Sequence, residues 1–184
     1  MNPHNRDRKY LVTGASGYVG GRLVRALIDD KEDVRILVRD KNKIMGQPWA
    51  PLVEICEGSA ESFSDLQQAL EGVHTAFYLL HSINLGPNFN HIESEMAKNF
   101  AKAAEQAGVT QIIYLGGIAN DVNISKHLAS RAMTGTSLAT TSVAVMELRA
   151  GIIIGSGSAS FEMLRHLTHR LPIRLRAYTI LYLS

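Results

Sequence analysis

The chain has one cysteine and no long apolar run, and these two features exclude several classes of protein. Cys56 is the only cysteine among 184 residues, so neither an internal disulfide nor a cysteine-rich metal cage can form. The opening stretch MNPHNRDRKY lacks the apolar segment of a secretory signal. No stretch approaches the ~20 apolar residues of a membrane span. We therefore expect a soluble, cytoplasmic protein without a membrane span.

An excess of charge of one sign is also missing. The chain has 19 Lys and Arg residues and 17 Asp and Glu residues, and its basic residues are spread along its length. Binding of nucleic acid normally requires a concentrated basic patch, so we expect no nucleic-acid partner. With 46% hydrophobic residues, the chain is long enough to form one domain with a sizeable core.

Short apolar runs alternate with helical patterns along the chain. Strands are predicted at residues 10–13, 34–38, 53–56, 75–79, 111–115 and 143–148. Helices are predicted after the first strand, over residues 88–108, in ISKHLASRAMTG (124–135) and over residues 158–169. This alternation predicts an α/β fold with a Rossmann-type doubly wound parallel sheet of strand order 3-2-1-4-5-6.

Glycines recur at positions 14, 17 and 20 in VTGASGYVGG, between a predicted strand and a predicted helix. Gly14 allows a sharp turn after the strand, Gly17 lets backbone N–H groups approach a pyrophosphate, and Gly20 lets the helix close on the sheet. The N-terminus of the helix then faces the anion. The order of strand, glycine turn and helix therefore predicts a dinucleotide site.

The end of the second predicted strand, VRILVRD, selects between two nicotinamide cofactors. An acid at this position would bind the 2′-hydroxyl of NAD, whereas an arginine accommodates the 2′-phosphate of NADP. Arg39 comes first, with Lys41 and Lys43 close behind, so NADP is favoured over NAD. Two alternatives stay open: Arg39 is a solvated charge in a surface turn, or a shift of one residue places Asp40 at the ribose.

Several segments together resemble the atypical short-chain dehydrogenase/reductases, specifically the NmrA-like NAD(P)-binding proteins. The resemblance rests on VTGASGYVGGRLVRALIDD, RILVRD, YLLHSI, IIYLGGI and ELRAGIIIGSGSASFEMLRHL. It implies four groups of cofactor contacts: Gly14, Ser16, Gly17, Tyr18, Val19 and Gly20 at the pyrophosphate, Arg39 at the 2′-phosphate, Ser59 and Ala60 near the adenine, and Leu80, His81 and Ser82 at the nicotinamide ribose.

The sequence departs from the pattern of the family at three sites. An Asp usually follows the glycine after the third strand, but EGSA has Ser59 there, which removes one acceptor for the adenine amino group. Active members place a Ser or Thr after the fifth strand, where YLGGI has Gly116 and Gly117. Their Tyr-x-x-x-Lys on the next helix corresponds to His127-x-x-x-Arg131 in this chain.

His127 and Arg131 are therefore the candidate catalytic residues. An imidazole titrates near neutral pH, so His127 can transfer a proton, whereas Arg131 can position hydroxyl groups but cannot release a proton. Their i, i+4 spacing places both on one face of the predicted helix. The alternative is that His127 is a solvated or capping residue.

Two further groups of polar residues have alternative interpretations. Glu162, His166 and His169 recur at helical spacing, but a fourth ligand and the HExxH pattern are missing. We therefore expect a solvated helix face and no metal. Glu147 and Arg149 flank the end of the last predicted strand, where open α/β sheets place ligands. They either line the substrate side or form a structural ion pair.

The expected organisation is an N-terminal tail (1–9), an NAD(P)-binding domain (10–173) and an atypical C-terminal tail (174–184). Members of the family continue into a substrate-binding portion, which we expect this chain to lack. The predicted function is hydride transfer between nicotinamide and an unidentified small substrate. The alternatives are a non-catalytic NADP(H)-sensing module that acts through a protein partner, and an inactive remnant.

Overall fold

The computed structural model describes residues 8–80, 89–118, 126–151 and 155. The chain divides into two compact units, residues 1–150 and 151–184, and every helix and strand discussed below belongs to the first. The helix predicted over residues 158–169 lies outside the described residues. In the part of the chain that is described, no helix is both long and apolar enough to cross a membrane.

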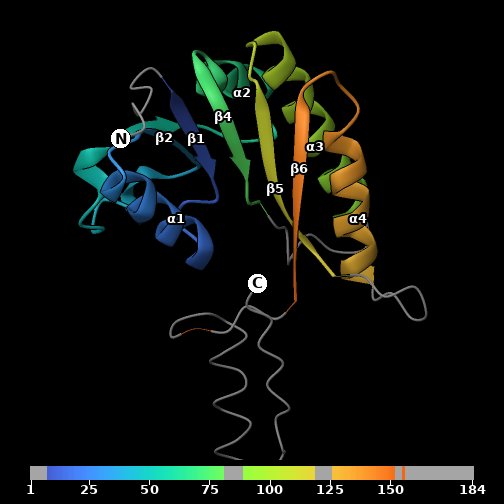
Figure 1. Ribbon diagram of the computed structural model, residues 1–184, viewed down its shortest axis with the longest axis horizontal. Coiled ribbons are helices and arrows are strands. Elements are labelled where there is room, and N and C mark those ends of the chain that lie inside the picture. The colour runs from blue at the N-terminus through green and yellow to red at the C-terminus, as the bar shows by residue number, and fades with distance from the viewer. Residues whose placement is uncertain (1–7, 81–88, 119–125, 152–154, 156–184) are drawn as a thin grey trace, which may run out of the picture. The chain divides into compact units, whose positions relative to one another are not determined.

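Six strands form one parallel sheet of order β3-β2-β1-β4-β5-β6 (Figure 1). The strands are β1 (Lys9–Thr13), β2 (Asp33–Val38), β3 (Glu54–Glu57), β4 (Val73–Tyr78), β5 (Gln111–Gly117) and β6 (Ala144–Ala150). The predicted fold class and strand order are confirmed, and each predicted strand matches an observed one to within two residues at each end. The apolar, β-branched composition of a central strand such as β2 is typical of strands that are covered on both faces, whereas the edge strands β3 and β6 are half-buried to exposed.

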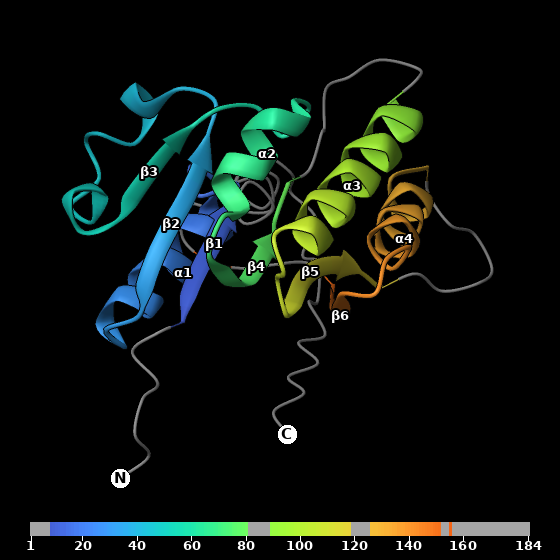
Figure 2. The ribbon, with the colours of Figure 1, turned by 90° about the horizontal axis from the view of Figure 1, so that it is seen from above.

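Helices cover the two faces of the sheet unequally. The helices are α1 (Tyr18–Asp29), α2 (Phe63–Leu70), α3 (Phe89–Gln106) and α4 (Lys126–Leu138), with short 3₁₀ turns η1 (Lys41–Lys43) and η2 (Ala50–Leu52). Figure 2 shows α1 on one face and α2, α3 and α4 on the other. Gly108 follows α3 with a φ of +73°, which is the left-handed conformation expected at a helix C-terminus.

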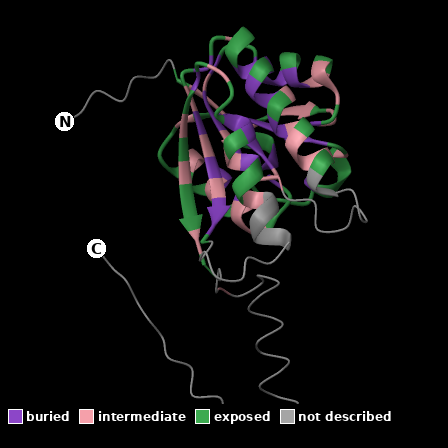
Figure 3. Ribbon diagram, turned by 90° about the vertical axis from the view of Figure 1, so that its right-hand side faces the viewer, coloured by how far each residue is buried: buried purple, intermediate pink, exposed green. Residues whose placement is uncertain are grey.

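The two faces have separate hydrophobic cores because side chains alternate along each strand. On the three-helix face, Phe100 of α3 packs with Tyr78 and Tyr114, and the Phe100 and Tyr78 rings are 5.0 Å apart. On the α1 face, Val24 lies in a second core that includes Val12. Figure 3 shows that the buried parts of the ribbon are concentrated on the strands and on parts of the helices.

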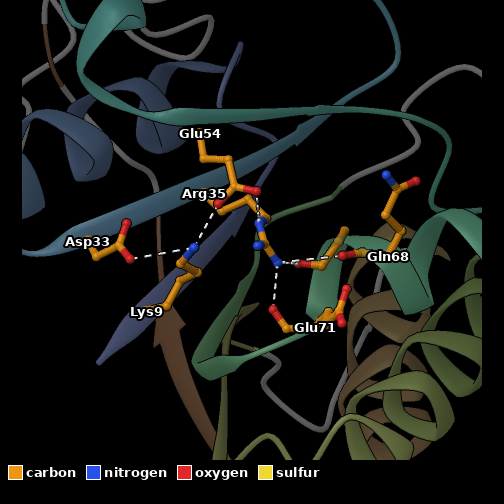
Figure 4. Close-up of polar contacts among 7 residues, drawn as sticks. Lys9, Asp33, Arg35, Glu54, Gln68 and Glu71 are labelled. Carbon is orange, nitrogen blue, oxygen red and sulfur yellow. Dashed lines mark hydrogen bonds and ion pairs between the residues drawn. The ribbon is translucent and has the colours of Figure 1, made fainter. Parts of the chain in front are cut away.

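A buried arginine joins β2 to the end of α2 (Figure 4). The Arg35 guanidinium donates hydrogen bonds to the backbone oxygens of Ala69, at 2.9 Å, and Glu71, at 2.7 Å. These carbonyls lie at the C-terminus of a helix, where no intrahelical donor is available, so the cation caps the helix. Arg35 Nε also forms an ion pair with Glu54 Oε1 at 2.9 Å. Lys9 extends the network by contacting Glu54 at 2.7 Å.

Candidate functional site

The glycine turn after β1 adopts a backbone conformation that depends on its first and third glycines. Gly14 has a φ of +71°, and a Cβ added there would lie 2.8 Å from the Leu79 backbone oxygen. A Cβ on Gly20 would overlap the Gly14 oxygen and lie 2.9 Å from Ala15 Cα. Gly20 therefore lets α1 close on the turn itself. The Gly17 N–H completes the turn by donating to the Gly14 oxygen at 2.9 Å.

The N-terminus of α1 is open to an anion. Gly17 is the N-cap residue, it provides no side-chain hydrogen bond, and the first turn of the helix contains no acidic residue. The N–H groups of Tyr18, Val19 and Gly20 have no preceding helical carbonyl to bind. Together with the helix dipole, they favour a phosphate group beside the exposed Ser16 and Gly17. This geometry fits the pyrophosphate contacts predicted for the turn.

The turn lies where the strand order reverses, between β1 and β4. Thr13 is fully buried, and its hydroxyl donates to the Phe77 oxygen at 2.9 Å and accepts from the Leu79 N–H at 3.1 Å. This clasp holds the ends of the two strands together at the crevice in which doubly wound sheets bind ligands. The sequence analysis did not single out Thr13. The sequence signal that could have identified it is a hydroxyl residue at the last position of an otherwise apolar strand.

Arg39 and Asp40 follow β2 at the same edge of the sheet. Asp40 is the N-cap residue of η1, and its carboxylate accepts the Asn42 N–H at 3.0 Å. Arg39 is exposed and forms no hydrogen bond or ion pair within the described part of the chain. Lys41 lies 3.5 Å from Glu57, in an exposed ion pair. One oxygen of the Asp40 carboxylate is therefore engaged in capping η1, whereas the Arg39 guanidinium has no partner among the described residues.

A carboxylate of α2, which the sequence analysis missed, accepts a hydrogen bond from the loop after β3. The Ser59 N–H donates to Asp65 Oδ2 at 2.8 Å, and the Ser59 hydroxyl accepts the Glu61 N–H at 3.2 Å. The hydrogen bonds from Ser59 and Ser62 lower the pKa of Asp65. Ala60 is buried beside them. Position 59 has no Asp, but α2 supplies the Asp65 carboxylate to this loop. The sequence signal for this contact was the position of Asp65, six residues after Ser59.

The segment that follows β4 is described as far as Leu80. Leu80 is half-buried and packs against the three-helix core. His81 and Ser82, the other residues predicted at the nicotinamide ribose, lie outside the described residues. Their predicted contacts stay predictions.

A carboxylate fills the space that a side chain at position 116 would occupy. Gly116 is buried at the end of β5, and an added Cβ would overlap Glu147 Oε1 and lie 3.1 Å from Glu147 Cδ. Gly135 of α4 borders the same carboxylate, at 3.5 Å from its own added Cβ to Glu147 Cδ. Arg149 Nη2 contacts Glu147 Oε2 at 3.1 Å, so the ion pair considered from the sequence forms. That pairing raises the pKa of Arg149.

Helix α4 carries positions 127 and 131 one turn apart, as predicted. The side chain of His127 lies outside the described residues, and that of Arg131 is half-buried. The Tyr114 hydroxyl donates to the Arg131 backbone oxygen at 3.0 Å. Burial raises the pKa of Tyr114 to about 12, although the Thr134 hydrogen bond and the Arg131 charge oppose this shift. Tyr114 therefore stays protonated near neutral pH and serves to anchor α4.

The described residues contain no group of three or more His, Cys, Asp or Glu side chains that could hold a metal ion. Glu162, His166 and His169 lie outside those residues. Cys56 is half-buried on β3, and burial raises the pKa of its thiol, so it lacks the thiolate character of a nucleophile.

The fold and the glycine turn define a nucleotide-binding α/β domain, and comparison with known proteins identifies its family. The model of a family described as NAD(P)H-binding matches residues 14–150. The chain belongs to this family, and its predicted place among the atypical short-chain dehydrogenase/reductases is confirmed.

The relatives include reductases, and the chain matches only part of each. A ceramide reductase from Caulobacter vibrioides is 27% identical over 165 residues, which are 88% of this chain and 51% of the relative. The chain spans about half the length of that protein.

Two solved structures have the same fold with different cofactors. The NADP(H) complex of Citrobacter sp. triphenylmethane reductase has a TM-score of 0.70 and 24% identity, over 88% of this chain and 55% of that one. The NAD complex of the Bordetella bronchiseptica enzyme WbmG has a TM-score of 0.65 and 16% identity, over 81% and 55%. At these identities the likeness shows the fold alone and leaves the choice between NADP and NAD to the residues of this chain.

Proposed function

We propose that this chain is an NADP(H)-dependent oxidoreductase that transfers a hydride between nicotinamide and a small substrate. The observation that carries the proposal is the uncapped N-terminus of α1 behind the Gly14 turn, at the crevice between β1 and β4. The bound cofactor would supply the hydride, and the protein would bind and orient it. The reductases among its relatives support this class of reaction.

The proposed preference for NADP rests on the residues after β2. Asp40 is engaged as a helix cap, whereas Arg39 is exposed and can form a charge-assisted hydrogen bond with a 2′-phosphate. Lys43 is exposed nearby and adds positive charge. A bidentate pair between a guanidinium and a phosphate contributes more binding energy than a hydrogen bond to a hydroxyl group. NADPH should therefore bind more tightly than NADH.

His127 and Arg131 remain the proposed catalytic pair. His127 would supply the proton that a carbonyl or quinone substrate needs after hydride transfer, and Arg131 would position hydroxyl groups. The NAD(P)-binding domain over residues 10–173 and a cytoplasmic location also remain predictions. The catalytic pair, the domain bounds and the location are each independent of the cofactor preference.

Two titrations test the proposal. Purified protein is titrated with NADPH and with NADH, and oxidation of bound NADPH is then followed with quinones, carbonyl compounds and triphenylmethane dyes as acceptors. Selective binding followed by turnover is the expected result. If neither nucleotide binds, the proposed function is wrong and the glycine turn has only a structural role.

The second candidate is a non-catalytic NADP(H)-sensing module that acts through a protein partner. One observation favours it: Glu147 fills the space at Gly116, where active relatives have a hydroxyl. Tight, selective NADPH binding without oxidation by any acceptor in the panel would support this candidate. An acceptor that is reduced at a steady rate would exclude it.

A further inference from the structure

A pocket separate from the cofactor crevice lies between the C-terminal ends of α2 and α3. Its volume is about 450 Å³, which is within the range of small-molecule sites. Both helices end just before β4 and β5 begin, whereas the glycine turn follows the carboxyl end of β1. The strands are parallel, so the pocket and the glycine turn lie at opposite edges of the sheet. The side chains that line the pocket are those of Gln67, Gln68 and Glu71 at the end of α2, and of Ala103, Gln106 and Ala107 at the end of α3.

The pocket combines an apolar floor with polar walls. Ala103 is fully buried and Ala107 is half-buried, and four residues of helix separate them by about 6 Å along its axis. Their methyl groups form a short apolar strip of about the length of a four-carbon chain. Gln67 Nε2 donates to Gln106 Oε1 at 3.1 Å, which joins the two walls. In the described part of the chain no donor reaches Gln67 Oε1, so this oxygen is available as an acceptor.

The charge around the pocket is negative and only partly balanced. Glu71 is exposed, and its carboxylate forms no ion pair with the described residues. The last turns of α2 and α3 contain no basic residue, so their terminal carbonyls add partial negative charge. Arg35 lies beside the end of α2, but backbone oxygens of that helix and Glu54 hold its guanidinium (Figure 4). Lys102 of α3 lies over the Phe63 ring, 5.7 Å from its centre. The Glu71 carboxylate and the end of α3 therefore lack a cation.

We propose that this pocket is a second ligand site, and that it binds an alkylguanidinium group. The guanidinium would pair with the Glu71 carboxylate, and the alkyl chain would lie along Ala103 and Ala107. A guanidinium is planar and carries five N–H donors, so it forms two parallel hydrogen bonds with a carboxylate and has donors left for an acceptor such as Gln67 Oε1. The site is independent of the proposed NADP(H) function, because it lies at the other edge of the sheet.

A guanidinium suits this pocket better than the other charged groups that proteins bind. It is more weakly hydrated than an ammonium ion, so less hydration is lost when it enters a partly enclosed pocket. An anion would be repelled by Glu71 and by the carbonyl ends of the two helices. A neutral head group of the same shape would keep the hydrogen bonds but lose the attraction to the carboxylate. Charge and shape are therefore separable in an experiment.

Two matched probes test the site without any nucleotide or turnover. Butylguanidinium and butylurea have the same chain and a planar head group of similar size, but only the first is charged. Each is titrated into ¹⁵N-labelled protein near neutral pH, and NMR follows the backbone N–H signals of Gly72 and Gly108, which lie at the ends of the two helices. We expect saturable shifts with butylguanidinium at a dissociation constant of about 1 mM, and binding of butylurea that is weaker by about fivefold.

Variants of the wall and of the floor separate the role of charge from that of space. Glu71→Gln should weaken butylguanidinium binding by about fivefold and change butylurea binding by less than about twofold. Glu61→Gln removes an exposed carboxylate before the start of α2 and should bind both probes like the wild type. Ala107→Leu fills the apolar strip and should weaken both probes by more than about tenfold. Ala26→Leu, at an exposed position of α1, is the control for size.

A third probe, Nα-acetyl-arginine N-methylamide, identifies the source of the group. Binding at least as tight as that of butylguanidinium would support an arginine side chain of a protein partner. Binding of butylguanidinium alone would support a free small molecule.

Three results would overturn the site. They are the absence of saturable shifts at Gly72 and Gly108 up to about 20 mM butylguanidinium, equal affinities for butylguanidinium and butylurea, and unchanged butylguanidinium affinity in Glu71→Gln. The same NMR spectra show whether each variant is folded, so a loss of binding is not mistaken for a loss of structure.

Discussion

At the scale of single residues, we expect the choice of cofactor to depend on Arg39 more than on its acidic neighbour. Asp40 is adjacent in sequence, but its carboxylate accepts the Asn42 N–H and caps η1. Arg39 projects from the same turn without a partner among the described residues. This local hydrogen bond supports the proposal that Arg39, rather than Asp40, meets the ribose end of the cofactor.

Replacing Arg39 with Ala should weaken NADPH binding by about tenfold to a hundredfold and leave NADH binding nearly unchanged. The reason is the loss of a charge-assisted pair with the 2′-phosphate, which NADH does not have. Isothermal titration calorimetry measures both affinities. Arg8→Ala, an exposed arginine before the amino end of β1, is the matched control. Equal losses for the two nucleotides would exclude recognition of the 2′-phosphate by Arg39.

His127→Ala should abolish NADPH oxidation with a quinone and leave NADPH affinity within about twofold of the wild type. The imidazole would supply the proton that the reduced quinone needs, and it would not contribute to holding the nucleotide. Stopped-flow absorbance of NADPH follows the reaction, and His91→Ala, an exposed histidine on α3, is the control. Unchanged quinone turnover in His127→Ala would remove this residue from the mechanism.

At the scale of elements, the glycine turn and α1 form one closely packed unit. Gly20→Ala should destabilise the protein by about 1–3 kcal/mol, because its Cβ would overlap the Gly14 backbone oxygen and force the helix away from the turn. NADPH binding should weaken as the N–H groups move. Urea unfolding and nucleotide titration measure the two effects, with Gly46→Ala as the glycine control. A Gly20→Ala variant that matches the wild type in both would contradict the close packing.

The network around Arg35 links β1, β2, β3 and α2 and should make stability depend on pH. Partial burial would raise the pKa of Glu54, but hydrogen bonds from Lys9 and Arg35 outweigh it and lower the pKa below its ordinary value of 4.5. The stabilisation is therefore present above that value and is lost as the pH falls through the lower, folded-state pKa. Glu54 is half exposed, so screening limits the effect to less than about 1 kcal/mol.

Urea unfolding of the wild type and Glu54→Gln at several pH values measures this contribution. The stability difference between them should be largest near neutral pH and shrink in acid. The Glu71 carboxylate forms none of these ion pairs, so the stability difference between the wild type and Glu71→Gln should show no comparable change with pH. A difference that stays constant from neutral to acidic pH would mean that Glu54 adds nothing through its charge.

The elements show which structural features sequence patterns predict well. The central strands such as β2 were predicted because buried parallel strands are nearly continuous apolar runs. The edge strands β3 and β6 are half-buried to exposed, and their short β-prone runs were the available signal. Helix α2 was missed because it has eight residues and only three buried ones, too few to give a clear helical period. Arg35 was missed because a charge inside a strand indicates exposure, and its partners are backbone oxygens of a helix 34 or more residues away.

The candidate site was predictable to the extent that it depends on local geometry. The turn at Gly14 and the start of α1 follow from one continuous segment, so spacing alone located them. The slot at Gly116 is different, because it is filled by Glu147 from another strand, 31 positions later, and bordered by Gly135 of a helix between them. Only the folded arrangement shows that the missing hydroxyl and this carboxylate are one feature.

At the scale of the whole molecule, ligand binding should stabilise the first unit as a whole. The cofactor crevice lies between β1 and β4, at the centre of the sheet, and Thr13 ties those strands together. A nucleotide that binds only the native state adds about 2.7 kcal/mol at a concentration of 100 times its dissociation constant. For a chain of this size that corresponds to a rise in melting temperature of about 5–10 °C.

Differential scanning fluorimetry with matched concentrations of NADPH, NADH and ADP-ribose measures this rise and divides it among the parts of the ligand. We expect NADPH to give the largest shift and Arg39→Ala to reduce it to the NADH value, since only the 2′-phosphate distinguishes the two nucleotides at that residue. ADP-ribose should retain most of the NADH shift, because the pyrophosphate at α1 supplies the main anionic contact. If ADP-ribose gives no shift while NADPH does, binding energy comes from the nicotinamide end, and the glycine turn is not the anchor of the site.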